Sequence, residues 1–575
     1  MKKLILTIAT ISSFVSMNAQ VPTMFEHLDI NNIKAEINSD GTFFWNLSTG
    51  QFEVPQGSGA HTIYANALWI GGVDASNNLK IAGQTYRQTG TDFWPGPLSS
   101  AGTTDSITMN AFNKIWKINQ CDIDTYISWF TSGASGVNPT DSAAMNTILT
   151  WPATGVAGAP LAPFFDSNTN GVYDPTSGDY PLIKGDQALF FVFNDNGGIH
   201  TETGGTAIGL EIQGMAYAYS CPNDSALYNT IFTNFKIINK SSFLLDSVFV
   251  GNWTDFDIGT YGDDFVGSDV TRGAYYGYNG DSIDDFPAAG QIAYGANPPA
   301  QAVTFLAGPY ANPNGIDDVA SSTVNGTNYG DGIVDNERLG MSKFLYYNND
   351  FTVTGNPSTA NNFYDYISGT WKDGTPLTYG GNGHLTGVAC DYMFPGTSDP
   401  LGYGTNMVPQ APWDETSSGN IPSDRRGLGS FGPFTFQPGS VHEIDFAYVF
   451  GRATSGGNLA SVTVMQERID SVRQKFNNGI TGCGCPSLTG ITNYDNSNSL
   501  SIYPNPATDN ITISFTTTSK NASIKIYDAR GRLVKSIANV KSGETAFNIS
   551  ELESGLYLIN VNDGNTSTTK RFIKQ

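Results

Sequence analysis

Apolar and polar residues alternate along most of the chain, which predicts many short β-strands. Two β-hairpins are expected near the N-terminus, over residues 28–47 and 65–86, and the apolar run QALFFVFND at 187–195 predicts a buried strand. Residues 227–259 and 431–453 each contain two long strands that run antiparallel about a short turn. This pattern predicts a mainly β fold, with a large body of β-sandwich type and long loops.

One late amphipathic helix interrupts the β pattern. Over residues 456–479, apolar side chains recur at three- and four-residue spacing, at Leu459, Val462, Met465, Ile469, Val472 and Phe476. Gly479 follows where a C-terminal capping glycine is expected. A shorter helical stretch, mixed with a strand, is expected within residues 111–130.

The first 19 residues have the pattern of a secretory signal peptide. Lys2 and Lys3 precede an apolar core from Leu4 to Val15, and the small residue Ala19 marks the expected cleavage site. The apolar core is too short to span about 30 Å of hydrocarbon at about 1.5 Å per residue. No later stretch reaches the roughly 18 consecutive apolar residues of a spanning helix, so we expect no transmembrane segment in the mature chain.

The end of the chain predicts a second, smaller β domain. Ile511, Ile513 and Phe515 alternate with polar residues, and the same period returns several times up to the C-terminus. Six or seven short strands in about 75 residues predict a small antiparallel β-sandwich. From Ser499 onward, nine Lys and Arg face six Asp and Glu, although the whole chain has a net charge of −23. This change of charge indicates two parts with different roles.

Three motifs of this tail occur in a recognisable order: YPNP at 503–506, IKIYDARGRLV at 524–534 and LESGLYLI at 552–559. In them the chain resembles the type A C-terminal sorting domain of cargo proteins of the type IX secretion system of Bacteroidota. The resemblance implies that the secretion machinery recognises residues 500–575. It also implies that the tail is removed and that the protein is attached to surface lipopolysaccharide or released, so we expect a secreted or outer-membrane surface protein.

The chain therefore divides into four expected segments. These are the signal peptide at 1–19, a β-rich extracellular body at 20–485, a polar linker at 486–499 and the sorting domain at 500–575. The body is long enough for two or more subdomains.

Composition restricts the partners that the body can have. The chain has 52 Asp and Glu against 29 Lys and Arg, which argues against nucleic acid, because phosphates require basic residues, and favours cations. Five cysteines are an odd number, so at least one thiol stays unpaired in an exported chain. We interpret Cys483-Gly484-Cys485, near the end of the body, as a disulfide partner.

The strongest candidate for cation binding is the loop FFDSNTNGVYDPTSGDYP. Asp166, Asn168 and Asn170 alternate before a glycine, and Asp174 follows, which resembles the start of an EF-hand-type or thrombospondin-3-type calcium loop. The glutamate expected at position 12 is replaced by Ser177. Calcium is the predicted ligand, and a turn stabilised by its own Asx side chains is the alternative.

Two further acidic stretches are weaker candidates. In NGTNYGDGIVDNERLG, the side chains of Asp331, Asp335 and Glu337 are expected to gather around a second calcium ion. The stretch DFDIGTYGDDFVGSD crowds five carboxylates together, at Asp255, Asp257, Asp263, Asp264 and Asp269. Because like charges repel, this stretch is either calcium-bound or an open, hydrated loop. Calcium would be structural in these loops.

No catalytic motif is identified in the body. GLGSFG at 427–432 matches a glycine-rich phosphate loop formally, but it runs into a strand instead of a helix, so we interpret it as a chance match. In GDYPLIKGDQA and GPFTFQPGSVHEIDFAYVF, the body resembles uncharacterised secreted proteins with the same tail. That resemblance does not indicate any particular activity.

We therefore expect a calcium-stabilised structural or ligand-binding body, adhesin-like, with surface polysaccharide or another glycan as its ligand. The alternative is a secreted glycan-active hydrolase. That enzyme would require a cleft with two carboxyl groups about 5–9.5 Å apart beside exposed aromatic rings.

Overall fold

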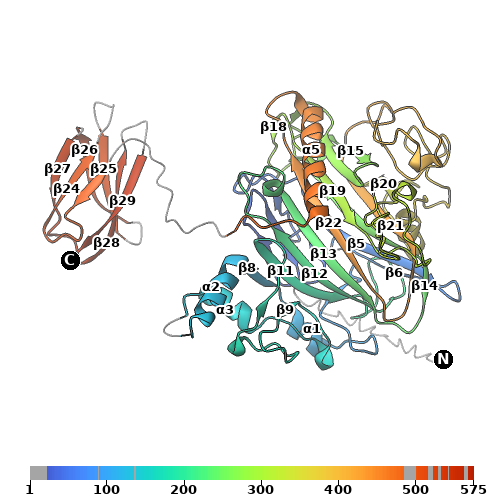
Figure 1. Ribbon diagram of the computed structural model, residues 1–575. Coiled ribbons are helices and arrows are strands. Elements are labelled where there is room, and N and C mark those ends of the chain that lie inside the picture. The colour runs from blue at the N-terminus through green and yellow to red at the C-terminus, as the bar shows by residue number, and fades with distance from the viewer. Residues whose placement is uncertain are drawn as a thin grey trace, which may run out of the picture. The chain divides into compact units, whose positions relative to one another are not determined.

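The computed structural model describes residues 23–88, 90–134, 138–484, 500–515, 522–528, 532–541, 543–562 and 567–575. The chain divides into two compact units, Met1–Pro486 and Ser487–Gln575, here called the body and the tail (Figure 1). The predicted signal peptide, 1–19, and linker, 486–499, lie outside the described residues. No helix in the described ranges is long and apolar enough to cross a lipid bilayer.

The first large sheet of the body has the strand order β1-β2-β3-β5-β14-β21-β20, with β4 paired to β2 and β6 paired to β5. Its strands are β1 (Phe25–Leu28), β2 (Lys34–Asn38), β3 (Thr42–Phe43), β4 (Phe52–Glu53), β5 (Ile63–Asp74), β6 (Leu79–Gly83), β14 (Leu245–Phe256), β20 (Lys343–Asn348) and β21 (Arg425–Phe436). Both predicted N-terminal hairpins are confirmed, because β2 pairs with β3 and β5 pairs with β6.

The second large sheet has the order β15-β16-β19-β22-β13-β12-β11-β7, with β8 paired to β11. Its strands are β7 (Trp94–Pro95), β8 (Trp116–Asn119), β11 (Gln187–Asn194), β12 (Leu210–Ala218), β13 (Thr230–Asn239), β15 (Asp264–Asp269), β16 (Ala274–Asn279), β19 (Ala300–Ala307) and β22 (Val441–Gly451). Two small ribbons lie apart from it, β9 (Phe164–Phe165) with β10 (Tyr180–Pro181), and β17 (Ile283–Asp284) with β18 (Gly295–Ala296).

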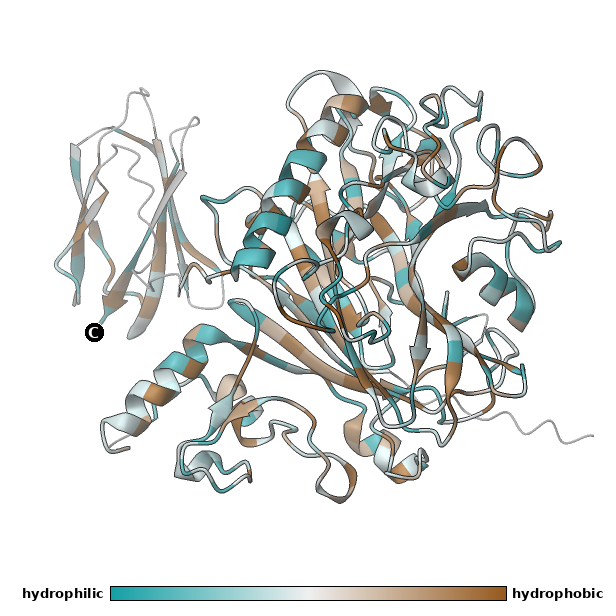
Figure 2. Ribbon diagram, turned by 45° about the vertical axis from the view of Figure 1, so that its right-hand side comes forward, coloured by the Kyte–Doolittle hydropathy of each residue, from teal (hydrophilic) through white to brown (hydrophobic). Residues whose placement is uncertain are grey.

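The two large sheets pack face to face, as a β-sandwich requires. The ring of Phe43 on β3 lies 5.6 Å from that of Phe191 on β11, and the ring of Phe305 on β19 lies 4.6 Å from that of Phe431 on β21. Apolar residues are concentrated on these strands (Figure 2). Burial of each such ring stabilises the fold by roughly 1.5–3 kcal/mol.

Strand β11 is apolar from Ala188 to Phe193 because both of its faces are covered. Leu189, Phe191 and Phe193 belong to the core between the sheets, whereas Ala188, Phe190 and Val192 belong to a second apolar cluster on the other face. Because successive residues of a strand point to opposite faces, a strand that is covered on both sides has apolar residues at consecutive positions, and polar residues remain only at its two ends. The predicted buried strand is confirmed.

The four long strands of residues 227–259 and 431–453 were predicted correctly as strands. The two strands of each segment do not pair with each other, however, so neither segment forms the expected hairpin. β13 and β14 follow each other in the chain and lie in opposite sheets, and so do β21 and β22. β14 pairs with β21, and β13 pairs with β22. The two crossings are joined by hydrogen bonds, because the amide of Asn239 donates to the carbonyl oxygen of Phe436 at 3.2 Å and the N–H of Gly439 donates to the carbonyl oxygen of Asn239 at 2.7 Å.

The glycines of GLGSFG have a packing role in β21. A Cβ atom on Gly427 or Gly429 would lie 2.9 or 2.8 Å from the ring of Tyr275, which packs on the strand from the opposite sheet. The whole motif lies within a strand, so it opens no helix and forms no phosphate loop.

Helices cover the outer faces of the sheets. α5 (Gly457–Asn478) packs on β19 and β22, buries Val462, Met465, Ile469 and Val472, and ends at the capping residue Gly479, which confirms the predicted helix. α1 (Ser106–Phe112), α2 (Gln120–Thr131) and α3 (Ser142–Leu149) contact strands of the second sheet, and α4 (Ala360–Ile367) contacts the first. α2 was predicted, whereas α1, α3 and α4 were not. Single 3-10 turns lie at η1 (Val156–Gly158), η2 (Pro175–Ser177), η3 (Leu227–Asn229), η4 (Tyr261–Asp263), η5 (Ala320–Ser322) and η6 (Tyr403–Thr405).

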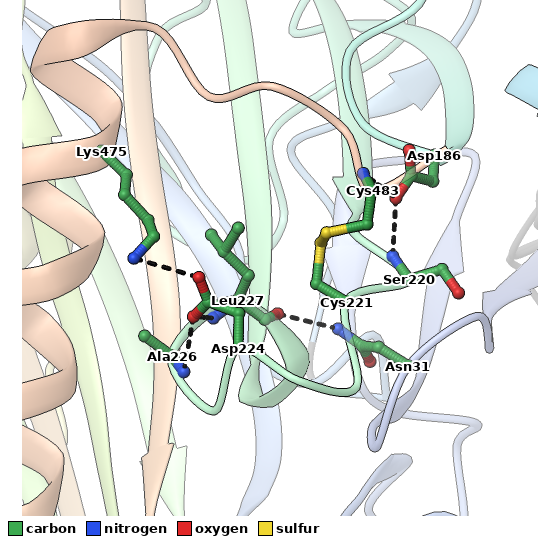
Figure 3. The surroundings of a disulfide bond; sticks show 9 residues. All are labelled: Asn31, Asp186, Ser220, Cys221, Asp224, Ala226, Leu227, Lys475 and Cys483. Carbon is green, nitrogen blue, oxygen red and sulfur yellow. Dashed lines mark hydrogen bonds and ion pairs between the residues drawn. A yellow bond between two sulfur atoms is a disulfide. The ribbon is translucent and has the colours of Figure 1, made fainter. Parts of the chain in front are cut away.

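A disulfide closes the C-terminal end of the body (Figure 3). Cys221, between β12 and β13, is bonded to Cys483, with their Cα atoms 5.4 Å apart. The carboxylate of Asp186 accepts the N–H of Ser220 at 2.8 Å, and Lys475 of α5 pairs with Asp224 at 3.0 Å. Cys483 is thus a disulfide partner as predicted, Cys121 is disulfide-bonded too, and the buried Cys390 is free, as the odd number of cysteines requires.

The tail consists of two antiparallel sheets with a separate apolar core. One sheet contains β23 (Ser501–Tyr503), β24 (Asn510–Phe515) and β27 (Gly543–Asn548), and the other contains β25 (Ala522–Asp528), β26 (Leu533–Val540), β28 (Gly555–Asn562) and β29 (Ser567–Lys574). Ile511, Ile513 and Phe515 are buried between them, with residues from β25 and β28. The predicted mainly β fold, with a sandwich-type body and a small C-terminal β domain, is confirmed.

Candidate functional site

A cavity of about 440 Å³ opens where three neighbouring strands inside the first sheet begin or end. The start of β5, the end of β14 and the start of β21 meet there, because these neighbouring strands are antiparallel and Asp255 is level with both Ala65 and Arg426. Polar residues at the cavity are Ser48, Thr49, His61, Gln88, Asp255, Asp257, Gln291, Asn349, Asp424 and Arg426, and aromatic residues are Trp45, Tyr64, Tyr86 and Tyr261. We call this cavity the acidic pocket.

Three carboxylates converge in the acidic pocket. Asp255 lies on β14, Asp257 follows that strand directly, and Asp424 directly precedes β21. One oxygen from each of these side chains lies within 4.8 Å of the others. Asp255 and Asp257 are only 2% exposed. The alternative of an open, hydrated loop is therefore wrong for these two residues.

The other carboxylates of the same stretch go elsewhere. Asp264 is buried and accepts the N–H of Ile258 at 2.9 Å, and Asp269 is buried and pairs with Arg272 at 2.9 Å. Asp263 lies in η4 and accepts the hydroxyl of Thr260. The structure thus separates the five acidic residues that the sequence placed in one loop.

Arg426 and Tyr86 connect two of the three carboxylates. The guanidinium of Arg426 lies 2.8 Å from Asp424, and it also donates to the hydroxyl of Tyr86 at 2.8 Å. That hydroxyl donates in turn to Asp255. One cation therefore faces three carboxylates, which leaves the pocket with excess negative charge.

Burial shifts the pKa values of the ionisable side chains in the pocket. It raises the pKa of Asp255 and of Asp257 well above the usual range, and Asp424 raises both further, whereas Arg426 opposes the shift. Burial lowers the pKa of His61 to about 4, so its imidazole is neutral at pH 7. The pocket is therefore a place where a proton or a cation is favourable beside the carboxylates.

Several polar atoms of the pocket have no hydrogen-bond partner. They include Oδ1 of Asp255 and Nε2 of His61. The latter lies 3.5 Å from an oxygen of Asp257 without forming a hydrogen bond. Buried polar atoms are normally satisfied, so such atoms indicate a missing partner.

Aromatic rings form one wall of the pocket. The ring of Trp45 lies 4.5 Å from that of Tyr64, which lies 6.1 Å from that of Tyr86. Tyr261, on η4, is 40% exposed. The pocket combines carboxylate and amide groups with ring surfaces, which suits a ligand with both hydroxyl groups and apolar faces.

The first predicted calcium loop has oxygens that are bound to its own backbone. Asp166 accepts the N–H groups of Asn170 and Gly171, at 3.1 and 2.6 Å. Asn168 accepts the N–H of Asn170, the side chain of Asn170 accepts that of Val172, and Asp174 accepts that of Thr176. These are the contacts of the Asx-turn alternative, and calcium binding here stays a prediction.

The second predicted loop is joined by another segment. Asp335 accepts the N–H groups of Asn314 and Gly315, at 2.8 and 2.9 Å, and Glu337 accepts that of Asp318 at 2.5 Å. Asp331 accepts the N–H of Ile333 within its own loop. Among the described residues, the acidic pocket alone holds three Asp, Glu, His or Cys ligand atoms within 4.8 Å of one another, so Asp331, Asp335 and Glu337 do not form such a group.

Sequence reasoning found only part of the acidic pocket. It singled out Asp255 and Asp257, but it missed Asp424, Arg426 and His61. Their positions in the chain lie far apart, and no local spacing connects them.

The tail matches a known family. Residues 501–575 match the family described as a secretion system C-terminal sorting domain. The chain is therefore a type IX secretion cargo protein that carries its sorting domain at the C-terminus, and it is destined for the cell surface or the medium.

Solved structures offer weak likenesses. A protein of family DUF3244 from Bacteroides vulgatus, with an immunoglobulin-like β-sandwich fold, is 18% identical over 13% of this chain and 84% of its own, with a TM-score of 0.12. A polysaccharide lyase is 8% identical over 69% of this chain, with a TM-score of 0.19, and this chain covers 37% of the lyase. No curated protein matches the chain significantly. At these scores the likenesses carry no argument about the body.

Proposed function

We propose that the body is a ligand-binding module, delivered outside the cell by its tail, and that it binds a saccharide in the acidic pocket. The observation that carries this proposal is the combination, in one cavity, of hydrogen-bonding carboxylates and amides with an aromatic wall. Sugars present hydroxyl groups at their edges and apolar C–H groups on their faces. A cavity of about 440 Å³ falls within the usual size range of small-ligand sites.

The charge of the pocket restricts the kind of saccharide. Asp255, Asp257 and Asp424 face a single guanidinium, that of Arg426, which is already engaged by Asp424 and Tyr86. While no cation is bound there, a carboxylated or sulfated sugar would meet net repulsion from the ionised carboxylates. The expected ligand is therefore a neutral or amino sugar.

A binding screen with the purified body tests this proposal. Tyr261 offers the most accessible ring of the pocket, so Tyr261→Ala should weaken the binding of a neutral saccharide roughly three- to tenfold, as loss of one ring contact does. Tyr310→Ala is the matched control, because Tyr310 is 39% exposed and lies outside the pocket. Titration calorimetry on an array-selected sugar measures both. Equal affinity in the two variants, or no saccharide bound, contradicts the proposal.

A glycan-active hydrolase is the second candidate. The raised pKa of Asp255 and Asp257 is favourable for a carboxyl group that donates a proton. However, one oxygen from each of the three carboxylates lies within 4.8 Å of the others, which makes the cluster more compact than the carboxyl pair of an inverting glycosidase, whose two groups are roughly 6.5–9.5 Å apart. The geometry therefore favours a binding module over a hydrolase. If the wild-type body released reducing ends from a glycan and Asp255→Asn did not, the hydrolase would become the preferred function.

Structural calcium is a further part of the proposal. Asp166, Asn168, Asn170 and Asp174 would bind one ion, and Asp331, Asp335 and Glu337 would contribute to a second. Both stretches are rich in oxygen ligands, and both lie in long connections without regular strands. Calcium would compete there with the N–H groups that the carboxylates now accept.

A further inference from the structure

The three carboxylates of the acidic pocket come from two segments that lie far apart in the sequence, the end of β14 and the start of β21, but they share one centre. Oxygens of Asp255, Asp257 and Asp424 lie within 4.8 Å of one another. The end of β14 pairs with the start of β21, and this pairing fixes the positions of the three residues. Their arrangement therefore does not depend on a single flexible loop. A group that lies between them would contact all three.

Two buried polar atoms of the pocket, one of them on a member of this group, lack the partners that buried polar atoms require. Oδ1 of Asp255 and Nε2 of His61 make no hydrogen bond, and these residues are only 2% and 4% exposed. Nε2 of His61 lies 3.5 Å from an oxygen of Asp257 and therefore faces one member of the group, next to the three carboxylates whose oxygens lie within 4.8 Å of one another. The unpartnered atoms are both electron-pair donors when imidazole Nε2 is unprotonated, which indicates an electron-pair acceptor as the missing partner.

The charge at the centre points to the same partner. When all three carboxyl groups are ionised, one guanidinium balances only one of them, so two negative charges remain in a mostly buried place. Buried carboxylates are stable only when they are paired, protonated or bound to metal. A divalent cation would supply both the missing positive charge and the missing electron-pair acceptor.

We propose that Asp255, Asp257 and Asp424 bind a divalent cation, with Nε2 of His61 as the fourth ligand. A mixed set of carboxylate oxygens and one imidazole nitrogen suits Mn²⁺ or Zn²⁺ better than Ca²⁺, which prefers oxygen alone. The cavity above the cluster leaves a path for the ion and room for a further ligand. The cation site does not depend on saccharide binding.

Metal binding by the mature, tail-bearing protein without any saccharide tests this proposal. After treatment with chelator and dialysis, calorimetry with MnCl₂ and ZnCl₂ should show one strong site, with affinity at least tenfold lower in Asp257→Asn. Asp391→Asn is the control, because Asp391 pairs with Lys343 outside the pocket. Absence of a strong site, or equal affinity in both variants, overturns the proposal.

Spectroscopy of the wild-type protein provides a second readout that does not require a folded variant. Mn²⁺ at this site should show electron spin-echo modulation from one imidazole nitrogen, and His61→Gln should abolish that signal without abolishing binding. Bound Mn²⁺ without a nitrogen signal would overturn the assigned ligand set. Because no sugar is present, a failure here is distinct from a failure of the saccharide proposal.

Discussion

At the scale of single residues, His442 illustrates how burial determines protonation. Its ring packs against Phe434 and Phe436, with ring centroids 4.8 and 5.0 Å away, and its Nδ1 accepts the N–H of Tyr310 at 3.1 Å. Burial, together with the nearby charge of Arg338, lowers the pKa of His442 to about 4. The neutral ring is therefore part of the folded core.

This shift predicts a pH dependence of stability. The unfolded chain binds a proton at His442 near pH 6.5 and the folded chain only near pH 4, so stability is complete above about pH 6.5 and falls as the pH drops towards 4. The loss amounts to at most about 3 kcal/mol. Urea unfolding at pH 7 and pH 4.5 should show a smaller loss in His442→Gln than in the wild type. If both proteins lose the same free energy, His442 is not responsible.

The residues of the acidic pocket show the limit of sequence reasoning at this scale. Asp255 and Asp257 are close in the chain, so their spacing was visible as a crowded acidic stretch. Asp424 and His61 reach the same centre only because β21 and the start of β5 flank β14 in the first sheet. Strand pairing across more than a hundred residues leaves no local pattern in a single sequence.

At the scale of elements, the positions of strands were predictable and their partners were not. Alternation shows which residues share a face, but it is the same for a hairpin and for two strands that cross between sheets. For this reason β13 and β14 were found as strands, while their separation into opposite sheets was not. α5 was predictable because it repeats its apolar spacing over 22 residues, whereas α3 and α4 have only eight residues each.

The first calcium loop gives a prediction at the same scale. If the loop binds calcium with the roughly 10⁻⁴ M affinity of extracellular modules, about 2 mM calcium should stabilise the body by about 1–2 kcal/mol. Scanning calorimetry with and without chelator should show this difference in the wild type and a smaller one in Asp166→Ala, which keeps only the second proposed calcium site.

The matched control is Asp74→Ala. Asp74 also accepts backbone N–H groups in a turn, those of Ser76 and Asn78, each at 2.9 Å, but it lies outside the loop. This variant should keep the response to calcium, which separates loss of the ion from loss of an Asx turn. A wild-type melt that chelator leaves unchanged would rule out the calcium loop.

At the scale of the whole molecule, the body and the tail have separate apolar cores. Buried tail residues such as Ile511, Ile524 and Ile559 belong to one cluster that contains no residue of the body. The small domain could be predicted with more detail than the large one, because its motifs follow one another in a short segment. Its role in export follows from the family match over residues 501–575.

Deletion of residues 499–575 should therefore change location and not stability. The melting temperature of the body should stay the same, because no core residue is lost, and the truncated protein should remain in the periplasm. Cell fractionation and protease treatment of intact cells measure the location, with the full-length protein as reference. A truncated protein that reaches the surface normally would argue decisively against the sorting role.

The bond between Cys221 and Cys483 also has a mechanical consequence. A pulling force applied to the tail would reach the disulfide-bonded part of the body at Cys483, after the end of α5. There the disulfide would pass the force to the connection between β12 and β13, so the force would not act directly on the contact between α5 and strand β22. A body closed by this disulfide would resist unfolding that starts from its C-terminal end.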